Sequence, residues 1–330
     1  MRLWRRAKAA ALTRRRLLAG VGLSALAGVG GTALRGSPSP SQPTTAEPAT
    51  GPAIHAATVW RGGYAGLVAG PDGVAPHLLH VGGDRRVRIG QRLPVTLPPE
   101  FQPWGIAAAG GTLWITGTVG HLAEVVTVDN RADGVPEEFR DIAAAGDPAL
   151  PDGVFDLEVW HYRPALYASD GESVTAVELP VPDEIRWGAA TAIATDGHGT
   201  LVVALDGCPD PDAAVVTRSH LAVSTDNGLT WQQWLLDKSL REGYATTLSV
   251  TGGRLAAACV DGEGTRRLRL GPLSPRPELR LVETVSGGGP VAGVLFDGRD
   301  GVRLVSDGVV VNGTDDMWIT VQVDGAYLGG

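Results

Sequence analysis

Short apolar runs alternate with turn residues along the chain from about His55 onward. Asp-Gly pairs separate many of these runs and occur eleven times, for example at Asp72–Gly73 and Asp307–Gly308. Gly tolerates the positive φ of tight hairpin turns, so an Asp-Gly pair between apolar runs is a strong hairpin signal. The only stretch that favours a helix is a turn or two within residues 136–145. The pattern therefore predicts an all-β body built from antiparallel hairpins.

One hairpin unit recurs along this body: an apolar strand, a Gly-containing turn, a Leu and a second apolar strand. The clearest copies begin at Ile106, Ala192, Leu248 and Val294, and looser copies surround Leu79 and Leu166. Copies at intervals of roughly 35–54 residues that contain only hairpins are typical of radial β architectures. We predict a β-propeller of about six four-stranded blades over residues 55–330, with seven blades also open. A pair of β-sandwich domains is the alternative fold.

The fourth copy contains a specific eight-residue motif, Ser-Thr-Asp-Asn-Gly-Leu-Thr-Trp. Its five defined positions are Ser224, Asp226, Gly228, Thr230 and Trp231. An Asp at this place can accept turn N–H groups, the Gly allows a left-handed backbone, and the Trp supplies a large apolar face. The motif resembles the Asp-box of the sialidase-like β-propeller superfamily. The resemblance implies a structural turn between the outer strands of a blade, away from the ligand-binding end of the channel.

The N-terminal sequence has the pattern of an export signal. Residues 1–35 carry eight basic and no acidic side chains, and Leu17–Leu34 contains no charge. The segment around Arg14 and Arg15, Thr-Arg-Arg-Arg-Leu-Leu, resembles the twin-arginine signal, which implies export of a folded protein. An uncleaved membrane anchor is the alternative. Residues 36–54 are rich in Pro, Ser and Thr and are predicted to form a flexible linker.

Charge excludes several classes of partner. Of the 28 basic side chains, 20 remain in residues 36–330 against 36 acidic ones, a net charge of −16. Phosphate backbones and anionic lipids need clustered Lys and Arg, so we expect no nucleic-acid binding. Contact with a membrane is expected only through an uncleaved N-terminal segment, and the protein is expected to be monomeric.

Candidate catalytic and metal-binding groups are few. The resemblance to sialidases would require three arginines around a substrate carboxylate, a Tyr–Glu nucleophile and an acid/base Asp. The nearest string to the usual first-arginine segment, Tyr162-Arg163-Pro164, lacks its Ile and falls in the wrong repeat. We therefore assign no catalytic residue. His77 and His80 fall on a predicted strand, where they point to opposite faces, so we expect no metal site and no cofactor.

The two cysteines and nine tryptophans are the remaining candidates for a structural or ligand-binding role. Cys208 and Cys259 fall at equivalent places in adjacent repeats, so an exported protein could pair them. The alternative is a buried thiol and a loop thiol. Most tryptophans are expected between blades, with one or two at the channel mouth as a sugar-stacking platform.

These features predict a secreted or cell-envelope propeller that binds a glycan or a protein partner at the channel mouth. One alternative is a glycoside hydrolase of the sialidase-like type with a diverged active site. A second alternative is an assembly or scaffold factor.

Overall fold

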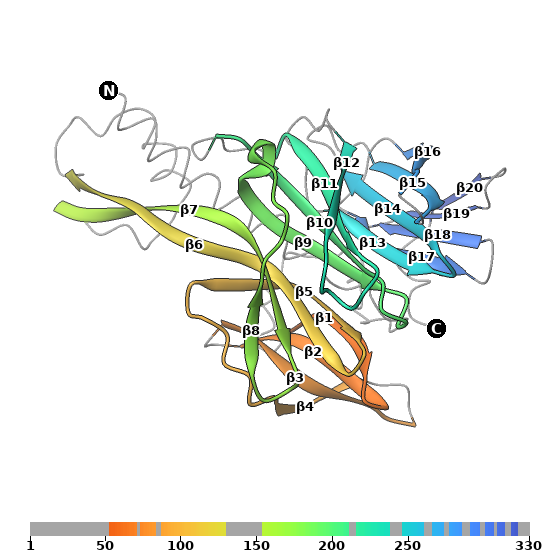
Figure 1. Cartoon of the computed structure of the whole chain (residues 1–330), viewed down its shortest axis with the longest axis horizontal. Helices are drawn as coiled ribbons and strands as arrows, with labels where there is room; N and C mark the ends of the chain where they lie inside the picture. Colours follow the sequence, from red (N-terminus) through yellow and green to blue (C-terminus); the bar gives the residue numbers. More distant parts are fainter. Residues whose placement is uncertain are drawn as a thin grey trace, which may run out of the picture.

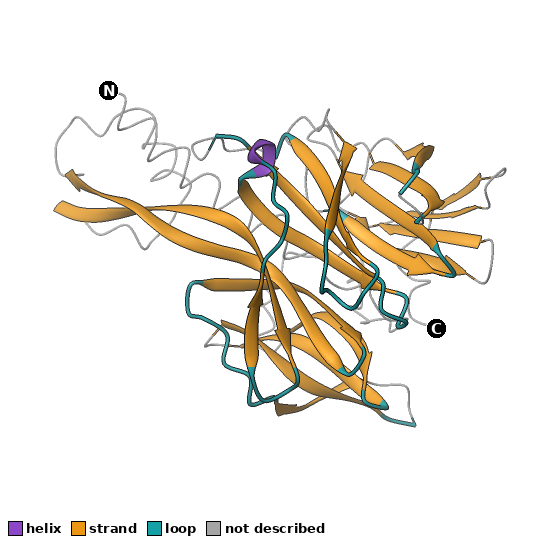
Figure 2. Ribbon diagram, in the orientation of Figure 1, coloured by secondary structure: helices purple, strands orange, loops and turns teal. Residues whose placement is uncertain are grey.

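The computed structural model describes residues 53–70, 73–83, 87–129, 154–210, 216–237, 246–260, 266–273, 277–285, 291–297, 301–306, 309–313 and 318–322. Within these residues, four-stranded antiparallel sheets are arranged as a β-propeller (Figures 1 and 2). The predicted all-β fold with four-stranded units is confirmed. The export signal with Arg14 and Arg15, nearly all of the predicted linker, and residues 136–145 lie outside the described residues. The first strand already begins at Ala53, just before the predicted domain boundary.

The sheets follow one another in chain order, and each meander lies next to the previous one. Sheet 1 consists of β1 (Ala53–Trp60), β2 (Gly63–Gly70), β3 (Gly73–Val81) and β4 (Val87–Arg92). Sheet 2 consists of β5 (Phe101–Ala109), β6 (Thr112–Asp129), β7 (Val154–Ser169) and β8 (Val174–Val177). A short 3-10 helix, η1 (Asp183–Ile185), connects sheet 2 to sheet 3.

Sheets 3 to 5 repeat the same arrangement. Sheet 3 consists of β9 (Trp187–Thr195), β10 (Leu201–Cys208), β11 (Arg218–Ser224) and β12 (Gln232–Asp237). Sheet 4 consists of β13 (Thr247–Thr251), β14 (Arg254–Val260), β15 (Arg266–Pro272) and β16 (Arg280–Val285). Sheet 5 consists of β17 (Val291–Asp297), β18 (Gly301–Ser306), β19 (Val309–Gly313) and β20 (Trp318–Gln322).

Tight turns join the first two strands of three sheets. Their central residues are Arg61–Gly62, Gly110–Gly111 and Gly252–Gly253, and both residues of each pair have positive φ. Two consecutive positive φ angles define the turn that matches the twist of a two-stranded hairpin. The first strand of each sheet lies beside the first strand of the next, in the order β1, β5, β9, β13, β17.

Apolar cores fill the spaces between consecutive sheets. Leu67, Phe101 and Leu113 pack between sheets 1 and 2, and the next core joins sheets 2 and 3. Sheets 3 and 4 share a third core, and sheets 4 and 5 share a fourth. Burying one Leu or Phe contributes roughly 1.5–3 kcal/mol, so each sheet depends on its neighbours for stability.

The described residues form five four-stranded sheets, whereas the repeat pattern favoured about six blades. The difference arises in sheet 2. Leu113 and Leu166 each marked a repeat in the sequence, but they lie on the paired strands β6 and β7, where Thr116 is opposite Leu166. Beyond Val119, β6 pairs only with β7, and the two strands run out past β5 and β8 (Figure 1). One long hairpin thus occupies the length of chain that resembled an extra repeat.

Candidate functional site

The sheets have two chemically different ends. At one end, which we call the hairpin end, lie the turns between first and second strands and between third and fourth strands. At the other, the connection end, lie the links between sheets, including η1. Loops at one end of a rigid scaffold are the usual place for binding residues, so the residues at each end decide which end can bind a ligand.

The residues that resemble an Asp-box, called the Asp-box turn below, form the turn between β11 and β12 at the hairpin end. The Asp226 carboxylate accepts hydrogen bonds from the Ser224 hydroxyl (2.8 Å), the Thr230 N–H (2.9 Å) and the Thr230 hydroxyl. The hydrogen bonds from Thr230 and Ser224 lower the pKa of Asp226 to about 2. Every partner of this carboxylate is a donor within the turn, which is a structural arrangement rather than a reactive one.

The same turn docks onto sheet 2. Gly228 has φ +79°, and a Cβ atom there would overlap the Trp114 ring. Trp231 donates its indole N–H to the Gly228 carbonyl (3.1 Å) and lies edge-on to Trp114, with ring centroids 6.4 Å apart. The motif therefore joins two neighbouring sheets.

The turn between β7 and β8 repeats this design with a shorter sequence. The Asp170 carboxylate accepts the N–H groups of Glu172 (2.9 Å) and Ser173 (2.8 Å). Gly171 has φ +98°, and a Cβ there would come within 2.7 Å of the Trp60 ring of sheet 1. The hairpin end is thus occupied by turns that hold sheets together.

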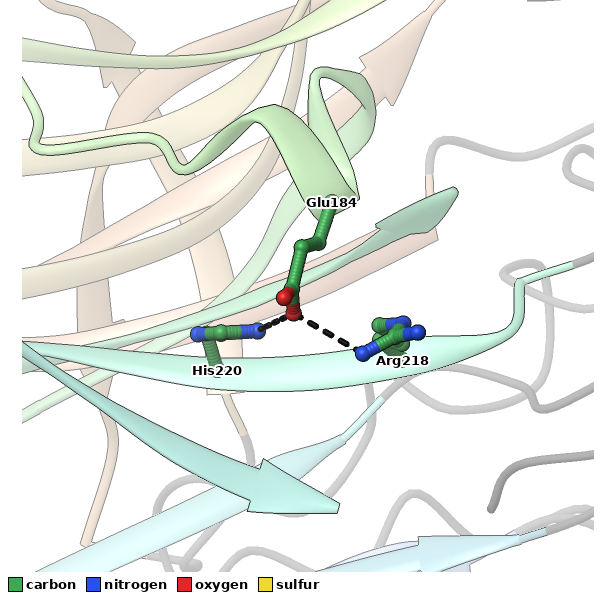
Figure 3. Close-up of polar contacts among 3 residues, drawn as sticks. All are labelled: Glu184, Arg218 and His220. Atoms are coloured by element: carbon green, nitrogen blue, oxygen red, sulfur yellow. Dashed lines mark hydrogen bonds and ion pairs between the residues drawn. The ribbon is translucent and has the colours of Figure 1, made fainter. Parts of the chain in front are cut away.

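The connection end of sheet 3 carries a different set of residues. Glu184 on η1 accepts a hydrogen bond from Arg218 (2.9 Å) and lies 3.5 Å from Nε2 of His220; both partners are on β11 (Figure 3). The Glu184 and Arg218 side chains are 51% and 37% exposed, so a ligand can reach both. Burial lowers the pKa of His220, and the Glu184 carboxylate opposes this shift.

Trp187, the first residue of β9, lies at the same end of sheet 3 and contacts two arginines. The guanidinium carbon of Arg163 lies 4.6 Å from the Trp187 ring centroid, and that of Arg186 lies 5.7 Å away. The His161 ring is edge-on to Trp187 at 5.0 Å. Trp187 is half-buried and Arg186 is exposed. We refer to Arg163, Glu184, Arg186, Trp187 and Arg218 as the connection-end cluster.

The buried hydroxyl of Thr118 connects the two strands that carry Arg163 and Trp187. The Thr118 side chain lies 3.0 Å from both the Arg163 carbonyl on β7 and the Gly188 carbonyl on β9. Thr118 is 2% exposed. Its hydroxyl holds the backbone of Arg163 next to the strand that carries Trp187, which positions the guanidinium over the ring.

The buried carboxylate of Asp206 lies between sheets 3 and 4. Asp206 on β10 accepts hydrogen bonds from the Thr246 N–H (2.8 Å), the Thr246 hydroxyl (2.9 Å) and the Thr191 hydroxyl. Burial raises the pKa of Asp206, although these hydrogen bonds and one from Ser219 oppose the shift. Each partner needs only a hydrogen-bond acceptor, so the role of Asp206 is to link sheet 3 to the start of sheet 4 by hydrogen bonds.

The two cysteines are free thiols, so the disulfide considered from the sequence is not formed in this structure. The Cys208 thiol donates to the Asp210 carbonyl (3.1 Å), and burial raises its pKa to about 11. Cys259 is buried on β14, with its sulfur 3.7 Å from Nη1 of Arg269. Each sulfur thus has its own partner within its own sheet region.

A further hollow lies between the outer strands of sheets 3 and 4. It is a cavity of about 390 Å³ lined by Leu221, Trp234, Leu235, Leu236, Pro277, Glu278, Leu279 and Arg280. Leu235 is 48% exposed there. Six of the eight lining residues are apolar, and Glu278 and Arg280 are the charged ones.

Sequence reasoning located only part of this picture. Ser224, Asp226, Gly228, Thr230 and Trp231 lie together in one turn, whereas Cys208 and Cys259 are not bonded. The connection-end cluster was missed, apart from the expectation that one or two tryptophans would lie at the channel mouth. Within the described part of the chain, no group of three potential metal-ligating side chains gathers, and no helix has the length and apolar character needed to cross a membrane.

Solved structures resemble the chain in fold. A protein of unknown function from Dyadobacter fermentans is 10% identical, with a TM-score of 0.51, over 83% of this chain and 82% of that one. A fucose-recognising six-bladed lectin from Aleuria aurantia is 11% identical, with a TM-score of 0.45, over 82% of this chain and 78% of the lectin. YCF48, solved with a D1 peptide, is 12% identical, with a TM-score of 0.42, over 82% of this chain and 66% of that chain. Neither a protein-family model nor a curated protein matches the chain. At these identities, the likeness concerns the propeller fold alone.

Proposed function

We propose that this chain is an exported β-propeller that binds a glycan at the connection-end cluster. The observation that carries the proposal is the exposed Glu184–Arg218 pair at the same end of sheet 3 as the half-buried Trp187, where strand connections gather. Binding sites of this kind combine an apolar aromatic surface with a few fixed polar groups. The N-terminal resemblance to a twin-arginine signal supports a location outside the cytoplasm or in the cell envelope.

Each part of the cluster suits a sugar. The Glu184 carboxylate accepts hydrogen bonds from hydroxyl groups, and the guanidinium of Arg218 donates to hydroxyl and ring oxygens. Trp187 holds the guanidiniums of Arg163 and Arg186 in place, and the exposed part of its half-buried side chain offers an apolar surface for C–H groups. Since Glu184 and Arg218 already contact each other, their geometry is fixed before a ligand arrives, which lowers the entropic cost of binding.

A glycan array followed by titration of the best glycan tests this proposal with the full-length chain. We expect Trp187→Ala to weaken binding by tenfold or more, because loss of an aromatic contact worth about 1.4 kcal/mol has that effect. Glu184→Gln, at an exposed position, is expected to weaken binding several-fold without loss of folding.

Trp234→Ala is the matched control, since Trp234 is a half-buried tryptophan on the outer strand β12. We expect the control to bind like the wild type. Equal losses in Trp187→Ala and Trp234→Ala would contradict a site at the connection end. Absence of binding to every glycan would contradict the function itself and favour a protein partner, whereas glycoside turnover in the same samples would favour the hydrolase alternative.

A further inference from the structure

The arginines around Trp187 are not neutralised. Among the described residues, neither Arg163 nor Arg186 lies within ion-pair distance of a carboxylate, whereas Arg218 is paired with Glu184. Residues 36–330 carry 16 more acidic than basic side chains. Two guanidiniums that contact one tryptophan ring, and that have no ion-pair partner among the described residues, form a local positive site in an acidic body.

A cation–π contact does not satisfy the N–H donors of these guanidiniums. The guanidinium carbons of Arg163 and Arg186 lie 4.6 and 5.7 Å from the Trp187 ring centroid, within the range of such a contact. The N–H groups of a guanidinium lie in the plane of the group, where they match the two oxygens of an oxyanion. The ring thus orients the cations without satisfying their donors.

One of these donors lacks a hydrogen-bond partner within the part of the chain that the structure describes. Nε of Arg163 is buried and makes no hydrogen bond to any described residue. A buried donor without a partner costs roughly 1–3 kcal/mol, and this cost is removed when an acceptor reaches it. A small rotation of the guanidinium toward a bound oxygen would satisfy Nε, so the free site is better suited to an anion than to an uncharged hydroxyl.

We infer that the ligand of this site is an acidic polysaccharide whose oxyanion groups, carboxylate or sulfate, are bound by Arg163 and Arg186 over Trp187. This inference rests on the proposed glycan-binding function and names the class of glycan. Selectivity arises because charge-assisted hydrogen bonds to guanidinium are about twice as strong as neutral ones.

The test compares three polymers on the full-length chain: polygalacturonate, dextran sulfate and unmodified dextran. Binding is measured at low and at physiological salt, because ion-pair contributions decrease with ionic strength. We expect at least one acidic polymer to bind tenfold or more tightly than dextran. The polygalacturonate and dextran sulfate results distinguish carboxylate from sulfate as the bound group.

The double variant Arg163→Gln/Arg186→Gln is expected to lose this preference. Arg61→Gln is the control for charge alone, since Arg61 also stacks on a tryptophan, Trp60, at 4.5 Å, but at the hairpin end. We expect Arg61→Gln to keep the preference. Comparison of the circular dichroism spectra shows whether each variant is folded, and Arg186→Gln alone, at an exposed position, provides a second test if the double variant does not fold.

Three results would overturn the inference: dextran binding as tightly as the acidic polymers, an unchanged preference in the Arg163→Gln/Arg186→Gln and Arg186→Gln variants, or an equal loss in Arg61→Gln. If neutral glycans bind in a Trp187-dependent manner without any acidic preference, the proposed function stands and this inference fails. If no polysaccharide binds, both fail.

Discussion

Gly228 shows how one residue joins the Asp-box turn to the neighbouring sheet. Its φ of +79° is left-handed, and the space that a side chain would need is filled by the Trp114 ring. The adjacent Asn227 also has positive φ, and its N–H donates to the Gly199 carbonyl of the β9–β10 turn (2.9 Å). Position 228 therefore requires a left-handed backbone and also requires that no side chain occupy the space of the Trp114 ring.

Substitution of Gly228 by Ala separates these two requirements when Gly197→Ala is made in parallel. Gly197 has φ +78°, nearly the same backbone conformation, but nothing lies within 4 Å of its missing Cβ. We expect Gly197→Ala to lower the free energy of unfolding by about 1–2 kcal/mol through backbone strain. Gly228→Ala should cost a further 1–3 kcal/mol or so, because the methyl group overpacks against Trp114. Denaturant unfolding of both variants measures the difference, and equal losses would show that Trp114 does not limit this position.

The strands and turns were largely predictable, since they follow from local chemistry. Hairpins and the Asp-box turn depend on residues close in sequence, such as Ser224, Asp226 and Thr230. The number of sheets depends on pairing, and Leu166 resembled a repeat although it lies opposite Thr116 within sheet 2.

The connection-end cluster was not predictable, because it brings together residues from β7, η1, β9 and β11. Arg163 was noted in the sequence only for lacking the sialidase pattern, and Trp187 was one tryptophan among nine. The remaining local signal is the adjacent pair Arg186–Trp187, which gives no information about Arg163 or Glu184.

Asp206 on β10 accepts hydrogen bonds from Thr246, the residue just before β13. The contribution of Asp206 to the stability of the fold depends on pH. Burial raises the pKa of Asp206 above its ordinary value of 3.8, so the folded state favours the protonated carboxyl. The stabilising contribution is present below pH 3.8 and is lost as pH rises through the folded pKa. Asp206→Asn stays neutral and keeps an acceptor for the Thr246 N–H. We therefore expect the stability of Asp206→Asn relative to wild type to increase as pH rises above 3.8.

Unfolding measured between pH 2.5 and 7 tests this expectation, with two comparison variants. Asp226→Asn should show the opposite trend below pH 3.8, because the pKa of Asp226 is lowered to about 2 and its carboxylate stabilises the fold above that pH. Asp206→Ala should be about 1–3 kcal/mol less stable than Asp206→Asn at all pH values, since the buried Thr246 N–H loses its acceptor. Parallel pH curves for wild type and Asp206→Asn would show that Asp206 has the same proton affinity in the folded and unfolded states.

Among the described residues, the hairpin end is structural, and we propose that the connection end binds the ligand. The hairpin end carries Asp turns and glycines that dock onto tryptophans of the preceding sheet, as Gly171 does onto Trp60 and Gly228 onto Trp114. The connection end carries the exposed Glu184–Arg218 pair and the arginines around Trp187. This division is the central claim, because the proposed glycan site and its acidic ligand both depend on it.

Hydrogen–deuterium exchange of the full-length chain, with and without the tightest-binding polysaccharide, tests the division most directly. The account predicts that ligand slows amide exchange in residues 160–163, 183–188 and 217–220, which form the connection-end cluster and its supporting strands. Exchange in the Asp-box turn, residues 226–231, should stay unchanged. Protection confined to residues 226–231, or absent from all three connection-end segments while the polysaccharide is bound, would contradict the account.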